Sequence, residues 1–243
     1  MNNFVEQIER IESKLKLAKR VDRNLRVFGA SHHKYKIGNA INESRIVIFE
    51  DKYKIQLPIC YKAFLTKVGN GGSSYQNSAA GPFYGIYPLE ENIDELIDYP
   101  EKYISGKVKI HPNMSDELWV DLIRNFKENE DMSDEEFDKE IGSLYAGILP
   151  IGSQGCTYLH GIILNGYHKG KVVNLDLSMQ KPEFTFENNF LDWYERWLDE
   201  VISGELLKNE PNWFGYSKRV IPVITLNEIK ERKQKRWYEI WKK

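Results

Sequence analysis

The sequence predicts a folded chain that mixes helices with strands, and three kinds of pattern support this prediction. Apolar residues recur at three- and four-residue spacing in several segments, as they do on one face of a helix. Short β-branched and aromatic runs between these segments are typical of strands. Glycine clusters separate the two kinds of segment and can reverse the chain with little strain.

Composition excludes several classes of protein. A hydrophobic content of 41% over 243 residues excludes a disordered chain. The formal charge of −2 gives no general attraction to nucleic acid or membranes, and no apolar run is long enough to span a bilayer. Cys60 and Cys156 fit no metal spacing, so we interpret each as a buried free thiol rather than as half of a disulfide. Because the first residues lack an apolar signal core, we expect a cytoplasmic protein.

Residues 1–40 are expected to form an N-terminal amphipathic helix and a connection. Phe4, Ile8, Ile11 and Leu15 predict a helix from about Asn3 to Arg20. Such a helix can pack on the domain or form a short coiled-coil arm, but an arm would need three or more heptads and about two are present. The residues from 21 to 39 are polar and basic, and they are expected to be a connection.

The next segment combines helix, glycine and strand signals. A helix is expected from Glu43 to Tyr53. Pro58 can open another helix, because the backbone N–H that proline lacks would be unpaired in the first turn of a helix anyway. That helix should end in the cluster 69–72, and the aromatic run 83–87 should form a strand. Beyond it, a short helix is expected to stop at Tyr99-Pro100.

An acidic insertion is expected at 112–145. Residues 116–140 hold eleven acids and three bases, a local charge of −8. Ser115 can cap one helix, and Ser133 with Glu136 forms a capping box for a second. We expect two helices joined by an acidic turn.

The remaining chain returns to strands and ends in a basic extension. Strands are expected at 148–152, 158–164 and 171–177, with a turn at 152–155, and an aromatic helix from Phe190 should stop at Gly204. From Leu206 onward ten bases oppose four acids, a local charge of +6. In this extension, 205–243, we expect an edge strand at 220–224 and a helix opened by a capping box of Thr225 and Glu228. That helix either docks on the domain or binds nucleic acid or a membrane surface.

In order and spacing, these features resemble the SUKH superfamily from about Ile41 to Ser203, so a SUKH-like domain is expected at 41–204. The residues that carry the resemblance are Pro58, Tyr61, Phe64, Asn70, Gly71, Gly72, Gly85 and Trp193. It implies an α+β fold whose central sheet is mixed, largely antiparallel and packed with helices. It also implies an immunity protein, since bacterial members typically bind and block a toxin, often a nuclease. Other members are regulatory or scaffolding modules, and the family supplies no catalytic residues.

No catalytic, metal or cofactor site is predicted. The segment Gly152-Ser153-Gln154-Gly155 lacks the spacing of a nucleophile elbow, and His160 is expected to be a satisfied histidine of the sheet. A hydrolase therefore lacks a convergent set of reacting groups.

The acidic insertion is the candidate partner-binding segment. Dense carboxylates can be steered to the basic groove of a nuclease, although a merely soluble helical insertion would show the same composition. The expected partner is a cognate protein toxin, with no direct contact to nucleic acid or membrane. The candidate contact residues are Asp116, Glu117, Asp121, Asp131, Asp134 and Glu135.

Overall fold

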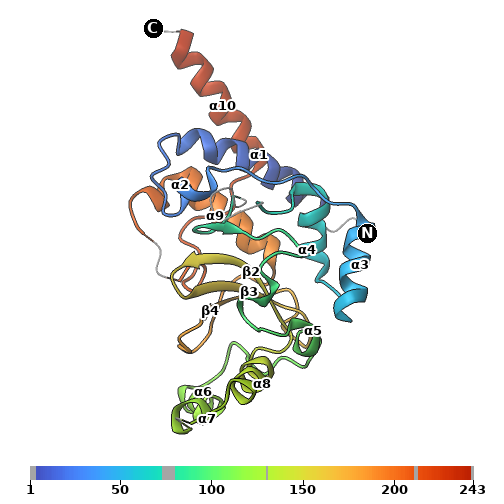
Figure 1. Ribbon diagram of the computed structural model, residues 1–243. Coiled ribbons are helices and arrows are strands. Elements are labelled where there is room, and N and C mark those ends of the chain that lie inside the picture. The colour runs from blue at the N-terminus through green and yellow to red at the C-terminus, as the bar shows by residue number, and fades with distance from the viewer. Residues whose placement is uncertain (1–3, 73–79, 130, 211–212, 242–243) are drawn as a thin grey trace.

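The computed structural model describes residues 4–72, 80–129, 131–210 and 213–241, with only the backbone of 236–241. A central sheet has helices on both faces, so the prediction of an α+β fold is confirmed (Figure 1). The strands follow one another in chain order across the sheet, and all four of their pairings are antiparallel. The strands are β1 (Gly85–Ile86), β2 (Ile148–Gly155), β3 (Tyr158–Ile163), β4 (Val172–Asp176) and β5 (Glu183–Phe184).

Helices make up most of the remaining regular structure. The α-helices are α1 (Val5–Val21), α2 (Ala30–His33), α3 (Glu43–Tyr53), α4 (Ile59–Ala63), α5 (Pro100–Tyr103), α6 (Asp116–Leu122), α7 (Arg124–Glu128), α8 (Asp134–Leu144), α9 (Phe190–Ser203) and α10 (Leu226–Trp241). Shorter helical turns are η1 (Phe64–Val68), η2 (Ile93–Glu95) and η3 (Glu205–Leu207). No helix of the described residues has the length and apolar character needed to cross a bilayer.

Both faces of the sheet are buried, in two separate apolar cores. Because side chains alternate along a strand, Ile162 of β3 belongs to the core that includes residues of α1, α4 and α9, whereas Ile163 belongs to the core on the opposite face. In Figure 1, α4 and α9 lie on one side of the sheet and α6–α8 on the other. This double coverage explains why the strands read as continuous apolar runs rather than as alternating ones.

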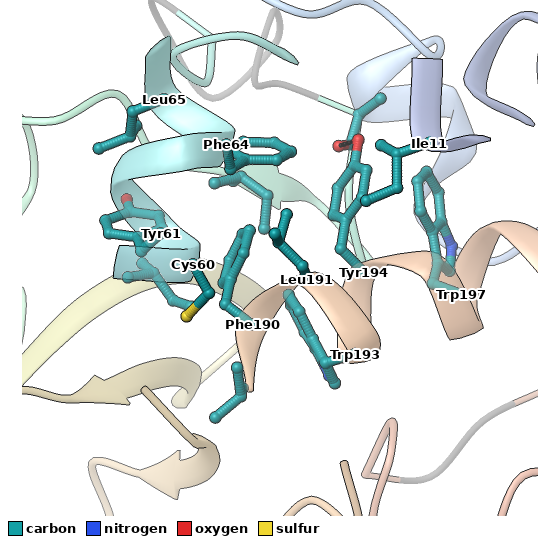
Figure 2. Close-up of a cluster of buried hydrophobic side chains, with 14 of the residues drawn as sticks. Ile11, Cys60, Tyr61, Phe64, Leu65, Phe190, Leu191, Trp193, Tyr194 and Trp197 are labelled. Atoms are coloured by element: carbon teal, nitrogen blue, oxygen red, sulfur yellow. Dashed lines mark hydrogen bonds between the residues drawn. The ribbon is translucent and has the colours of Figure 1, made fainter. Parts of the chain in front are cut away.

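The aromatic helix α9 is the centre of the larger core. Asn189 caps it by accepting backbone N–H bonds from Leu191 (2.9 Å) and Asp192 (3.2 Å), and Gly204 ends it at φ +84°. Figure 2 shows Tyr61 and Phe64 packed against Phe190, with ring centroids 4.9 Å apart in each pair. This face of α9 therefore holds the α4 segment onto the sheet.

A buried ionic cluster fixes α1 to α9. The Nζ atom of Lys14, whose side chain is fully buried, lies 2.8 Å from Oε1 of Glu195 and 2.6 Å from Oδ1 of Asp199. Arg10 pairs with the same Glu195 (2.7 Å), and Arg219 of the C-terminal segment pairs with Asp199 (2.8 Å). Thus α1, which precedes the expected domain at 41–204, and Arg219, which follows it, are both joined to α9.

The pKa values of the two carboxyls in this cluster move in opposite directions. Burial alone would raise the pKa of Glu195, but hydrogen bonds from Arg10 and Lys14 hold it below its ordinary value. Burial raises the pKa of Asp199 despite the opposing charges of Lys14 and Arg219. Glu195 is therefore the firmly ionised member of the cluster.

Several local predictions were wrong. The predicted strand at 220–224 is absent: these described residues lie outside every strand, and Pro222 has no backbone donor for a ladder. The predicted turn at 152–155 is the bulged end of β2, and the reversal comes at 156–157, where Cys156 is exposed rather than buried. Pro100 begins α5 instead of ending a helix.

The C-terminal helix α10 docks on the body only with its first turns. Its predicted capping box is present, because Thr225 N and Oγ1 both donate to Glu228 Oε2 (2.7 and 2.8 Å) and Glu228 N donates to Thr225 Oγ1 (3.3 Å). Ile229 is buried, and Arg232 Nη1 donates to Ile202 O (3.3 Å). Beyond this point the helix runs away from the body (Figure 1).

Candidate partner-binding surface

Most residues that carry the family resemblance are parts of the interior. Pro58 directly precedes α4, and Tyr61, Phe64 and Trp193 are buried in the larger core (Figure 2). Their aromatic side chains are therefore occupied by packing and offer no surface to a partner.

The glycine loop after η1 is shaped by close backbone contacts. Asn70 Oδ1 accepts a hydrogen bond from Leu89 N (2.8 Å), and Gly38 N donates to Gly71 O (2.6 Å). Gly71 has φ +58°, and a Cβ there would lie 2.4 Å from the backbone N of Pro88. Gly72 N donates to the carbonyl oxygen of Ile86, the residue that follows Gly85 in β1 (3.3 Å). The loop also borders a surface hollow of about 710 Å³ between 36–42 and 88–91.

The acidic insertion forms a lobe of three helices, α6–α8, rather than the two that we expected. Ser115 caps α6 by accepting from Leu118 N (3.2 Å), and the capping box of Ser133 and Glu136 opens α8 as predicted. The lobe packs on the sheet through Trp119 and Ile123, which are buried. The extra break arises at Ile123, which caps the end of α6 and precedes α7.

All six candidate acids are exposed on this lobe, at the end of the molecule opposite α10 (Figure 1). Asp116 and Glu117 lie in the first turn of α6, and Asp134 and Glu135 lie in the first turn of α8. Two of the six make surface ion pairs: Asp116 with Lys181, and Asp121 with Arg124. Asp131, Asp134 and Glu135 make none within the described part of the chain.

The carboxylates of the lobe differ in their electrostatic surroundings. Its own backbone N–H and the Ser115 hydroxyl lower the pKa of Glu117, as expected at a helix N-terminus. Partial desolvation and the neighbouring carboxyl of Asp98 raise the pKa of Asp138. Within the lobe, Asp134, four residues earlier in α8, adds a smaller effect in the same direction.

Exposed apolar side chains lie among these acids, which the sequence did not predict. Leu118, Val120 and Phe137 are 41%, 46% and 42% exposed. Trp119 and Ile123, four residues apart, occupy the buried face, so Leu118 and Val120 are left facing solvent. An acidic surface with apolar side chains is suited to a protein partner, because such side chains dominate the centres of protein interfaces.

The other titratable candidates do not converge on a reacting centre. His160 is fully buried in β3, and burial lowers its pKa to about 3. A side-chain interaction with Asn174, its register partner on β4, partly offsets this lowering. Ser153 Oγ accepts from Gly155 N (3.0 Å) in the bulge of β2. The described residues contain no group of three or more metal-ligating side chains.

Comparison with known proteins agrees with this architecture. The family model described as SMI1 / KNR4 family (SUKH-1) matches residues 40–196. No curated protein gives a significant match to the chain.

Proposed function

Because the chain belongs to the SMI1 / KNR4 family (SUKH-1), we propose that it is an immunity protein that binds a cognate toxin. It neutralises the toxin by covering part of its surface, acts in the cytoplasm and carries out no reaction of its own. The observation that carries this proposal beyond the family is the α6–α8 lobe, which carries six exposed acids together with exposed apolar side chains.

A basic protein is the partner that fits this lobe best. Carboxylates without an ion pair, such as Asp131 and Asp134, remain available to meet lysine and arginine side chains of a partner. Nuclease toxins must carry a basic groove for phosphate, so a nuclease is the preferred class of toxin. Opposite charges on the two proteins would raise the association rate, and the exposed Phe137 would supply apolar contact at the interface.

An immunity protein should be encoded directly after the gene of its toxin, so co-expression with the protein encoded directly upstream tests the proposal. We expect cells that produce both proteins to survive and cells that produce the upstream protein alone to die. A matched pair of variants locates the contact: Asp121→Lys with Asp131→Lys in the lobe, and Glu12→Lys with Glu210→Lys as a control of equal charge change at other exposed sites.

The lobe variant should lose protection and the control should keep it. Equal killing with and without the wild-type chain would contradict the immunity function. It would favour the alternative, a regulatory or scaffolding module that uses the same domain without a toxin. Full protection by the lobe variant would leave the immunity function standing but move the contact elsewhere.

A further inference from the structure

A second apolar surface is formed by residues of the start of α1, of α3 and of α4. These helices lie away from the α6–α8 lobe (Figure 1). A groove of about 600 Å³ runs between these helices, and apolar side chains from all three line it. Three of them are well exposed: Val5 of α1 (51%), Val47 of α3 (51%) and Ile59 of α4 (74%). Exposed apolar side chains that gather in one place mark interaction surfaces.

The charges around this groove are sorted by sign. The walls formed by α1 and α3 carry the acids Glu9, Glu43 and Glu50, whereas the wall formed by α4 and η1 carries Lys62 and Lys67. Glu50 and Lys62 pair within the chain, with Nζ 3.1 Å from Oε1. Glu9, Glu43 and Lys67 are exposed and make no ion pair within the described residues. One side of the groove is therefore left acidic and the other basic.

We propose that this groove is the interface with a second copy of the same chain. In a two-fold symmetric interface the same patch meets itself, so a residue away from the axis faces a different residue of the other copy. When the two-fold axis runs along the groove, the rotation exchanges its two sides and places the acidic side of each copy opposite the basic side of the other. Glu9 and Glu43 of each copy then face Lys67 of its partner, and Ile59 projects into the partner's groove.

Sedimentation velocity on the full chain tests the proposal, with Ile59→Asp as the first variant. An aspartate at the first position of α4 is compatible with a helix start, so the variant should fold. We expect the wild type to be dimeric at about 100 µM chain, and the variant to dissociate at least about tenfold more readily. Val220→Asp, at another well-exposed valine, is the control and should leave the dimer intact.

Charge-reversing substitutions distinguish this specific interface from non-specific association. Reversing the acids (Glu9→Lys with Glu43→Lys) or the lysine (Lys67→Glu) should each weaken the dimer about tenfold. The triple variant restores opposite signs across the two-fold axis and should recover most of the affinity. A monomeric wild type at 100 µM, or a dimer that Ile59→Asp leaves unchanged, would overturn the proposal. The readout needs no toxin, so it is independent of the proposed function.

Discussion

The carboxylates of α9 and those of the α6–α8 lobe are the same chemical group in opposite surroundings. Glu195 and Asp199 are buried and surrounded by Arg10, Lys14 and Arg219, all within ion-pair distance. The acids of the lobe are exposed, and several have no ion-pair partner within the described residues. The first group therefore contributes to holding the fold together, while the second is available to a partner. Net charge alone cannot distinguish these two uses.

The largest effect expected from this comparison is on stability. Lys14→Ala should lower the free energy of unfolding by about 3 kcal/mol, because it removes the cation shared by Glu195 and Asp199 and leaves each buried carboxylate with one arginine. Urea unfolding at pH 7 measures this loss. Lys16→Ala, at an exposed position of the same helix, is the control and should change stability by less than about 0.5 kcal/mol. Equal effects of the two substitutions would remove the distinction between the two groups of acids.

Acid should weaken the buried cluster through Glu195. The pKa of Glu195 in the folded protein lies below its ordinary value. The ionised carboxylate therefore contributes fully to stability above about pH 4.3, and this contribution is lost as the pH falls through the pKa of the folded protein. The stability difference between the wild type and Glu195→Gln should therefore shrink below about pH 4.3. Unfolding curves of both proteins between pH 7 and pH 3 measure it, and a difference that stays constant would contradict this account.

An exposed aromatic side chain of the lobe should matter for binding more than for folding. Phe137→Ala is expected to weaken toxin binding by about 2 kcal/mol, as aromatic residues at interface centres do. Titration calorimetry with the upstream-encoded protein measures the loss. Phe186→Ala, at another exposed phenylalanine, provides the control. Equal affinities of the two variants would exclude Phe137 from the contact.

The smallest effect concerns the helix that presents two of the acids. Ser133→Ala removes the side-chain cap of α8 and should cost about 1 kcal/mol of stability. Thermal unfolding measures it, and Ser13→Ala inside α1, away from any helix cap, serves for comparison. No loss relative to this control would mean that α8 does not depend on its capping box.

Local signals in the sequence located the helices better than the strands. Glu43–Tyr53 has the predicted bounds, because Asn42 caps it and its apolar residues keep helical spacing. The run 83–87 gave a strand of only two residues, and 220–224 gave none, since strands depend on partners that lie far away in the chain.

The two groups of charged residues show where sequence reasoning stops. The six acids of the lobe were found to be exposed, as their density suggested. The role of Lys14 was missed, although it lies between Ile11 and Leu15 on the apolar face of α1. Its two carboxylate partners are about 180 residues away along the chain, and no local pattern reports such a contact. Whether the exposed acids touch a toxin likewise depends on a second molecule.

The rate of association with the upstream-encoded protein, measured across a range of salt concentrations, tests the central claim most directly. The account predicts fast association of the wild type that slows steeply as salt is added. Asp121→Lys with Asp131→Lys should associate about tenfold more slowly at low salt, with little dependence on salt. The Glu12→Lys and Glu210→Lys control should match the wild type. Equal rates and equal salt dependence for the lobe variant and the wild type would contradict a role for the acidic lobe in binding.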